Sequence, residues 1–305
     1  MRVLVTGATG FVGSAAVRAL LRHGHNVLGL VRNPAKARAI TAAGAEVFAG
    51  DMWKPETYEP RVAEVDAVIH AAQQKTEGRW TRAKIHAMHE SDARMTRSLA
   101  SACLAQQKPF VYTSGALTHA RYGGVKVDES MPARPCLLAS GHAEMEAELV
   151  ELARTKGLRA TIISPGFVYG AGGILETMAK LIRRGQYRLI GPADNFWSLV
   201  HIDDVGEAYP LVLAKGKSGE AYFLGDDNPL PRREVVDRLA DALGAPRPKP
   251  VARLLAQLFF GRPLVEAITA PLYISNEKAK RELGWQPSHA SYVTSLPGTL
   301  AEMKL

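Results

Sequence analysis

The first residues able to do chemistry lie in a glycine-rich turn near the N-terminus. Gly7, Gly10 and Gly13 repeat every three residues, after an apolar β-branched run, Arg2–Thr6, and at the start of a helical stretch. The first glycine permits a tight turn, the second lets the backbone approach a pyrophosphate, and the third allows close helix–strand packing. Free N–H groups at the helix start favour phosphate. The turn therefore predicts a bound dinucleotide, contacted by Gly7, Thr9, Gly10, Phe11, Val12 and Gly13.

The end of the next apolar run, Asn26–Val31, indicates the phosphorylated form of the dinucleotide. An acidic residue at this place binds a ribose 2′-hydroxyl and repels a 2′-phosphate. Here the residue is Val31, and Arg32 follows it. A planar guanidinium pairs well with phosphate, and Lys36 lies one helical turn further on. We predict NADP(H) as the cofactor in preference to NAD(H). The alternative is that Arg32 only stacks on the adenine and both cofactors bind.

Alternating strands and helices are expected to position this turn. Apolar runs predict strands at 2–6, 26–31, 46–49, 67–70, 109–113 and 159–164. Helical spacing predicts helices at 11–23, 34–43, 92–106 and 142–156. This alternation is typical of the α/β class with a doubly wound parallel sheet, the Rossmann arrangement.

The pattern changes near residue 165, which predicts two domains. We expect residues 1–165 to form the dinucleotide-binding domain, with the chain returning to it at about 197–224. Residues 166–305 are expected to form mainly a smaller, partly helical substrate domain. Its expected elements are helices at 174–184, 203–213 and 232–243, a strand at 221–224 and a less regular tail.

Six further motifs resemble the extended short-chain dehydrogenase/reductase superfamily, the group of nucleotide-sugar epimerases and dehydratases. The likeness runs over nearly the whole chain, at Gly50–Met52, Val68–Ala72, Asp128–Pro132, Ser164–Gly170, Val200–Val205 and Lys278–Pro287. The resemblance implies an NAD(P)-dependent enzyme. The residues it adds to those expected against the cofactor are Asp51, Met52, Ala71, Ala72, Gln73, Lys75, Thr113, Pro165, Phe167 and Val168.

The usual chemistry of that family needs a tyrosine and, four residues later, a lysine on one helix face. The lysine lowers the pKa of the phenol, which moves a proton to or from a carbonyl oxygen while the nicotinamide carries the hydride. Counting from the acidic motifs on either side places the tyrosine position at Ser140 and the lysine position at Glu144. The serine position falls on Gly115, preceded by Ser114. The resemblance thus implies that the usual dyad is replaced.

Other residues are candidates for the proton relay. A Tyr-x-x-x-Lys sequence does occur at Tyr122 and Lys126, but two glycines and a valine between them form a poor helix, so it could act only through a rearranged loop. Glu144 could serve as a general acid or base if the cleft shifts its pKa. Ser114 could hydrogen-bond the substrate or the nicotinamide. Asp92 takes the place of the family's lysine-bracing asparagine and would repel Glu144 unless one carboxyl is protonated.

Trp197 bears on the substrate. Nucleotide-sugar enzymes of the family usually carry an arginine four residues before the histidine of the return segment, and Trp197 stands at that distance from His201. A tryptophan cannot clamp a diphosphate, so we expect a smaller or more apolar substrate, unless Trp197 is core packing. Three functions stay open. They are an NADP(H)-dependent oxidoreductase or epimerase/dehydratase-like enzyme acting on a carbonyl or alcohol with a non-standard proton relay, a non-redox isomerase or lyase, and a catalytically silent NADP(H)-binding sensor or regulatory protein.

Composition limits the compartment and the partners. The 305 residues carry a net charge of +8 but no dense basic block with interleaved aromatics, which favours anionic small ligands over nucleic acid. The sequence has no run of about 18 apolar residues, so we expect no membrane partner. Two cysteines and an N-terminus unlike a signal peptide indicate the cytoplasm. No set of His, Cys and carboxylates has metal-ligand spacing. The resemblance suggests a homodimer through helices 92–106 and 142–156.

Overall fold

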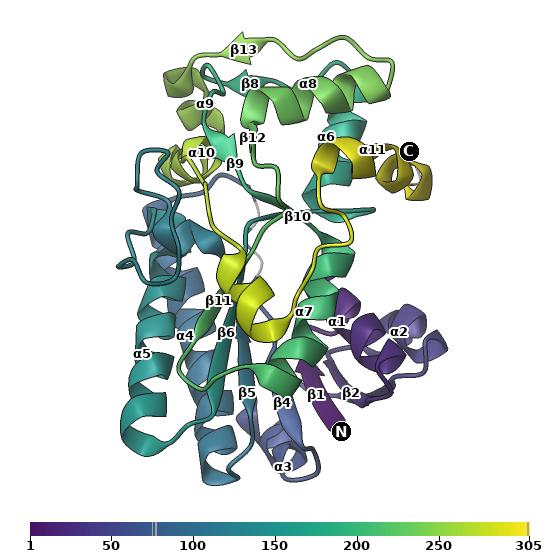
Figure 1. Ribbon diagram of the computed structural model, residues 1–305, viewed down its shortest axis with the longest axis vertical. Helices are drawn as coiled ribbons and strands as arrows, with labels where there is room; N and C mark the ends of the chain where they lie inside the picture. The colour runs from purple at the N-terminus through teal and green to yellow at the C-terminus, as the bar shows by residue number, and fades with distance from the viewer. Residues whose placement is uncertain (75, 77, 304) are drawn as a thin grey trace.

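Seven parallel strands form the central sheet of the computed structural model, which describes residues 1–74, 76, 78–303 and 305 (Figure 1). Their order across the sheet is β11-β6-β5-β4-β1-β2-β3, and every pairing is parallel. The strands are β1 (Arg2–Thr6), β2 (Asn26–Val31), β3 (Glu46–Ala49), β4 (Ala67–His70), β5 (Phe110–Thr113), β6 (Ala160–Pro165) and β11 (Ala221–Leu224). The predicted α/β class and doubly wound parallel sheet are confirmed.

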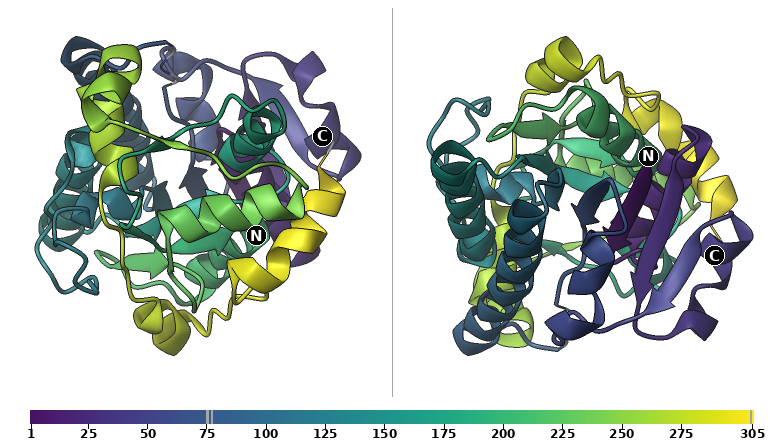
Figure 2. Two further views of the ribbon diagram at one scale, coloured as in Figure 1. Left: turned by 90° about the horizontal axis from the view of Figure 1, so that it is seen from above. Right: turned by 90° about the horizontal axis from the view of Figure 1, so that it is seen from below.

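Helices cover both faces of this sheet. They are α1 (Phe11–Arg22), α2 (Arg38–Ala42), α3 (Glu59–Val62), α4 (Arg82–Ala105), α5 (Ser140–Lys156) and α7 (Ile202–Lys215). Val3 and Val5 of β1 pack in one core with α1 and α7, whereas Leu4 packs in the other with α4 and α5. Successive strand residues point to opposite faces, so a continuous apolar run is buried on both sides, as a parallel sheet requires. Figure 2, seen from below, shows the blue and teal helices α4 and α5 side by side.

A second, smaller layer lies beyond the sheet (Figure 1). It contains the short strands β7 (Phe167–Tyr169), β8 (Leu189–Ile190), β9 (Phe196–Trp197), β10 (Leu199–His201), β12 (Leu230–Pro231) and β13 (Pro250–Val251), and the helices α6 (Gly173–Arg183), α8 (Arg232–Ala242), α9 (Arg253–Phe260), α10 (Arg262–Thr269) and α11 (Tyr292–Glu302). Leu175, Leu239 and Tyr292 share its core. Among the described residues, no helix combines the length and apolar character needed to cross a bilayer.

Two helices of the first half differ from the expected bounds. The helix expected at 92–106 begins at Arg82, where the hydroxyl of Thr81 accepts a hydrogen bond from the Lys84 N–H and caps the first turn. Its first turns are largely polar and bury few apolar side chains, so the apolar spacing in the sequence does not indicate a helix there. The helix expected at 34–43 is a short 3₁₀ turn, Pro34–Lys36, followed by α2, because the Asn33 side chain caps the turn separately.

The C-terminal tail is more regular than expected. It forms α9, α10 and α11 and a π-helical turn at Ala279–Leu283. Two of these helices contain prolines, which argue against a helix when only the sequence is considered. Pro263 lies in the first turn of α10, where its missing N–H costs nothing. Pro297 lies inside α11, where a proline normally argues against a helix. The division into domains at residue 165 stays a prediction.

Candidate functional site

A cleft of about 580 Å³ opens where β1, β2, β3, β4, β5 and β6 end. Most residues expected against the cofactor line it, and parts of it come from the loops after six different strands. Those that line it are Gly7, Thr9, Gly10, Phe11, Val12, Gly13, Arg32, Asp51, Met52, Ala71, Ala72, Gln73, Thr113, Pro165 and Val168. Lys36 and Phe167 do not line it, and Lys75 lies outside the described residues. Parallel sheets bind ligands at this edge.

The glycine turn leaves no room for side chains. Gly7 has a φ of +67°, and a Cβ on it would lie 2.6 Å from the carbonyl oxygen of Ala71. A Cβ on Gly13 would lie 2.1 Å from the carbonyl oxygen of Gly7. Gly10 begins α1 without any side-chain cap, so the first N–H groups of the helix are free for an anion. This cradle fits a dinucleotide pyrophosphate.

Gly13→Ala is expected to weaken NADPH binding by at least about 100-fold and to lower the melting temperature, because the new methyl overlaps backbone that cannot shift cheaply. Fluorescence titration of NADPH and thermal unfolding would measure both effects. Gly298→Ala is the matched control, since a Cβ added at this position of α11 would meet nothing within 4 Å. Equal NADPH affinity in the two variants would contradict this account of the turn.

Arg32 lines the cleft directly after the end of β2. It is exposed, and among the described residues it makes no ion pair. Val31 precedes it, so no carboxylate stands at the end of β2. Lys36, the second expected cation, lies in the 3₁₀ turn away from the cleft lining. Of the two cations that the sequence predicts beside the cofactor, Arg32 and Lys36, Arg32 is the one that lines the cleft.

The predicted dyad positions are not aimed into the cleft. The Ser140 hydroxyl donates to the carbonyl oxygen of Leu137 at 3.2 Å, and Glu144 is exposed. Neither residue lines the cleft. Burial raises the pKa of Asp92 to about 6, although a hydrogen bond from the Gln74 backbone partly opposes the shift.

The alternative pair, Tyr122 and Lys126, also lies away from the cleft lining. The Tyr122 hydroxyl donates to the carbonyl oxygen of Pro132, and the Arg134 guanidinium lies 4.6 Å from its ring centre. The Lys126 ammonium lies 5.9 Å from the ring centre of Tyr273. These contacts hold the two side chains in separate surroundings. Of the five candidate catalytic residues, Ser114 alone lines the cleft, and its buried hydroxyl lies near the carboxyl of Glu146, whose pKa it lowers.

Two residues that the sequence did not single out as a pair, His142 and Glu146, lie beside the cleft instead. They are four positions apart on α5, so one helix face carries both. The Nδ1 atom of His142 lies 2.7 Å from the Tyr112 hydroxyl, and its Nε2 atom lies 3.3 Å from the Gln73 amide. A carboxylate oxygen of Glu146 accepts a hydrogen bond from the Ser164 hydroxyl at 3.2 Å. Ser164 directly precedes Pro165, which lines the cleft.

Burial shifts the pKa values of both groups. It raises the pKa of Glu146 to about 7, although the nearby hydroxyls of Ser114 and Ser164 partly oppose the shift. It lowers the pKa of His142 to about 4, with a smaller contribution from His89. At neutral pH the imidazole is therefore uncharged and the carboxyl is poised between its two forms. Such a carboxyl can both give and accept a proton.

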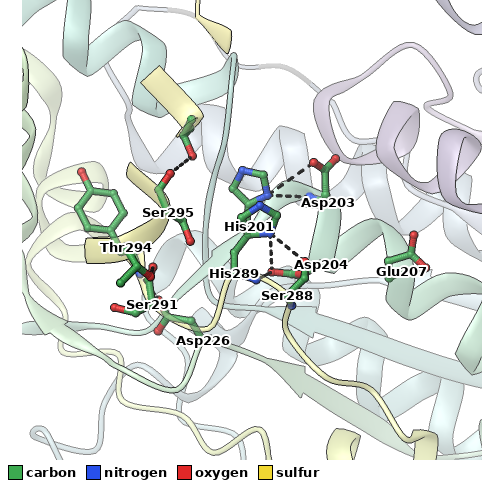
Figure 3. A network of polar contacts seen from close by, with 12 residues as sticks. His201, Asp203, Asp204, Glu207, Asp226, Ser288, His289, Ser291, Thr294 and Ser295 are labelled. Atoms are coloured by element: carbon green, nitrogen blue, oxygen red, sulfur yellow. Dashed lines mark hydrogen bonds and ion pairs between the residues drawn. The ribbon is translucent and has the colours of Figure 1, made fainter. Parts of the chain in front are cut away.

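A second polar cluster joins α7 to the C-terminal segment (Figure 3). His201, Asp204 and His289 bring possible metal-ligand atoms within 4.8 Å of one another. The Asp204 carboxylate, however, accepts hydrogen bonds from the Ser288 and His289 backbone and from the Ser288 hydroxyl. The rings of His201 and His289 stack with their centres 3.7 Å apart. These contacts hold the C-terminal segment against the start of α7. The spacing of residues in the sequence could not predict them, because Asp204 and His289 are far apart in sequence.

Comparisons with known proteins agree with the geometry. The model of the NAD dependent epimerase/dehydratase family matches residues 3–225. The 2-alkyl-3-oxoalkanoate reductase of Stenotrophomonas maltophilia is 30% identical over 94% of this chain and 95% of its own. The 4-hydroxy-2-methyl-3-oxo-4-farnesyl-3,4-dihydroquinoline-1-oxide ketoreductase of Stigmatella aurantiaca is 29% identical over 93% of this chain and 92% of its own.

A solved structure shows the same fold. The dTDP-glucose 4,6-dehydratase of Streptomyces venezuelae, crystallised with NAD, aligns over 99% of this chain and 96% of its own, with a TM-score of 0.84 and 25% identity. The chain belongs to the NAD-dependent epimerase/dehydratase family.

Proposed function

We propose that this protein is an NADP(H)-dependent reductase of a carbonyl group on a small, largely apolar molecule. One observation carries the proposal. Ser114, which lines the cleft that fits a dinucleotide, lies beside the half-buried carboxyl of Glu146, whose pKa burial raises to about 7. Reduction of a carbonyl needs a hydride at carbon and a proton at oxygen. A nicotinamide supplies the hydride when bound, so the protein has to supply the proton.

The side chains around the cleft are suited to supply that proton. The Ser114 hydroxyl, which lines the cleft and lies beside the Glu146 carboxyl, would donate a hydrogen bond to the substrate oxygen and orient it. Ser114 would pass its proton to the developing alkoxide and take the proton of the protonated Glu146, which becomes a carboxylate that water then reprotonates. The uncharged His142, fixed against Tyr112 and Gln73, holds that face of α5 in place without adding a competing charge.

Trp197 packs in the core of the second layer, so its own side chain does not select the substrate. Its ring stacks on Phe167 with centres 4.1 Å apart, and its indole N–H donates to the carbonyl oxygen of Ile268. Trp197 is buried, so it packs in the second layer and cannot contact a diphosphate in the way an arginine would. Two relatives carry names of reductases acting on alkyl- or farnesyl-bearing oxo compounds, which favours the same substrate class over nucleotide sugars.

The compartment and the cofactor preference complete the proposal. Cys103 and Cys136 are both free and buried, which suits the reducing cytoplasm. NADP(H) is preferred because Arg32 stands where an acid would select NAD(H). The non-redox and regulatory alternatives gain no support from the position of Glu146.

Loss of NADPH absorbance with a panel of substrates would test the function. We expect turnover with 3-oxo acids and ketones that carry long alkyl or prenyl chains, and none with dTDP-glucose or UDP-glucose. Mass spectrometry should show the matching alcohol. Conversion of a nucleotide sugar without net NADPH consumption would instead establish an epimerase or dehydratase. Tight NADPH binding with no turnover on either panel would point to a regulatory role.

A further inference from the structure

Helix α9 exposes an apolar surface that the described part of the fold does not cover. Within this helix only Ala256 is buried. Leu254, Leu258 and Phe259 are exposed by 77%, 68% and 68% of their surfaces. The α9 surface comprises five large apolar side chains, which are Leu254, Leu255, Leu258, Phe259 and Phe260. A soluble protein rarely leaves so dense an apolar patch without a partner.

The charged residues on and next to α9 in the sequence are basic. No acidic residue occurs between Asp241 and Glu266, whereas four basic residues do, which are Arg247, Lys249, Arg253 and Arg262. Arg247 pairs with Asp241. Lys249, Arg253 and Arg262 are exposed and have no ion pair among the described residues; Arg253 is the first residue of α9, and Arg262 lies two residues after its end. An apolar surface with a cationic border is complementary to a layer of anionic head groups above hydrocarbon.

The α9 surface adjoins a segment that starts in the cofactor cleft. The Trp80 N–H donates to the carbonyl oxygen of Phe260 at 3.0 Å, at the end of α9. A Cβ on Gly261 would lie 1.9 Å from the Trp80 carbonyl oxygen, so the two backbones are in close contact. Trp80 belongs to the connection between β4 and α4, whose first residues, Ala71 to Gln74, line the cleft.

We propose that α9 docks the protein on an anionic lipid bilayer, with its five apolar side chains at the head-group boundary and with Lys249, Arg253 and Arg262 on lipid phosphates. The same charges oppose a second copy of the chain as the occupant. A symmetric pair through α9 would bring two sets of cations together, and no carboxylate of the 242–265 stretch could neutralise them. An interfacial helix needs no membrane-spanning segment, so the proposal revises the expectation of no membrane partner.

Vesicle flotation of the full-length protein tests this proposal. The probes are vesicles of phosphatidylcholine mixed with phosphatidylglycerol and vesicles of phosphatidylcholine alone. We expect the wild type to float with the anionic vesicles and to be released by salt. Leu258→Asp combined with Phe259→Asp should lower the partition coefficient at least about tenfold. Arg253→Gln and Arg262→Gln should each lower it roughly fivefold. The matched control is Val150→Asp, which places an aspartate on the exposed side of α5.

Two results would overturn the proposal. The first is that the wild type stays at the bottom of the gradient with anionic vesicles, or that the double aspartate variant floats as well as the wild type. The second is that the wild type does not float but forms an assembly in gel filtration, and that the double aspartate substitution splits this assembly. A second copy of the chain would then cover α9. NADPH affinity and turnover in vesicle-free buffer should be the same for all variants. Failure of docking is thereby distinguished from failure of the proposed reaction.

Discussion

Glu146→Gln is expected to lower kcat for carbonyl reduction by about 10²- to 10³-fold, the usual contribution of a positioned acid. Glutamine keeps the shape and can still meet the Ser164 hydroxyl, but it cannot release a proton. The KM and the NADPH affinity should change little, because Glu146 does not line the cleft and would reach the substrate only through the Ser114 hydroxyl. Steady-state kinetics with an apolar ketone would measure the loss. Glu144→Gln, an exposed change two residues before it on α5, is the matched control and should be silent.

The pH dependence provides an independent readout. Burial raises the pKa of Glu146 from 4.5 to about 7, and reduction needs its protonated form. The kcat of the wild type should therefore fall as pH rises through about 7, and this inflection should be absent from Glu146→Gln. Because the folded state binds this proton more tightly than the unfolded state, the stabilising contribution is complete below about 4.5 and is lost as pH rises to about 7. A wild-type inflection that persists in the glutamine variant would exclude Glu146 as the acid.

Arg32→Ala is expected to raise the Kd for NADPH by about 10- to 100-fold and to leave the Kd for NADH nearly unchanged. A charge-assisted pair between a guanidinium and a phosphate contributes about 1.5 to 3 kcal/mol. NADH lacks the 2′-phosphate, so it loses nothing when the guanidinium is removed. Fluorescence titration with both cofactors, at low and at moderate salt, would measure the change.

Lys36→Ala is the control for this experiment. Lys36 carries the same charge a few residues away but does not line the cleft, so its removal should change NADPH affinity only slightly and in a salt-dependent way. Equal affinities for NADPH and NADH in the wild type, unchanged in Arg32→Ala, would show that Arg32 does not select the cofactor.

The sheet and the glycine turn could be predicted because their signals are local. Each strand of the sheet is a short apolar run, and the three glycines of the turn follow one another at a fixed spacing directly after β1. The direction of side chains on α5 could not be predicted in the same way. A Cβ on Gly141 would lie 2.4 Å from the His89 ring, so α5 packs very closely on α4 at this point.

That close packing fixes the rotation of α5 about its own axis. With Gly141 and Met145 turned inward, His142 and Glu146 reach Tyr112 and Ser164, while Glu144 turns toward solvent. Counting from flanking motifs gives a position in the chain but not an angle about a helix. The pair could have been noticed from its i, i+4 spacing alone, although nothing in the sequence shows that a histidine and a glutamate share a buried face.

The late position of α7 and β11 in the chain has a consequence for biosynthesis. α7 packs against α1 from nearly two hundred residues further along, β11 forms an edge of the sheet, and the Trp285 indole donates to the Asp204 carbonyl oxygen behind α7. A ribosome that has released only the first half of the protein therefore presents α1 with its apolar side uncovered. We expect such nascent chains to be the stage at which chaperones are needed and at which stalled products aggregate.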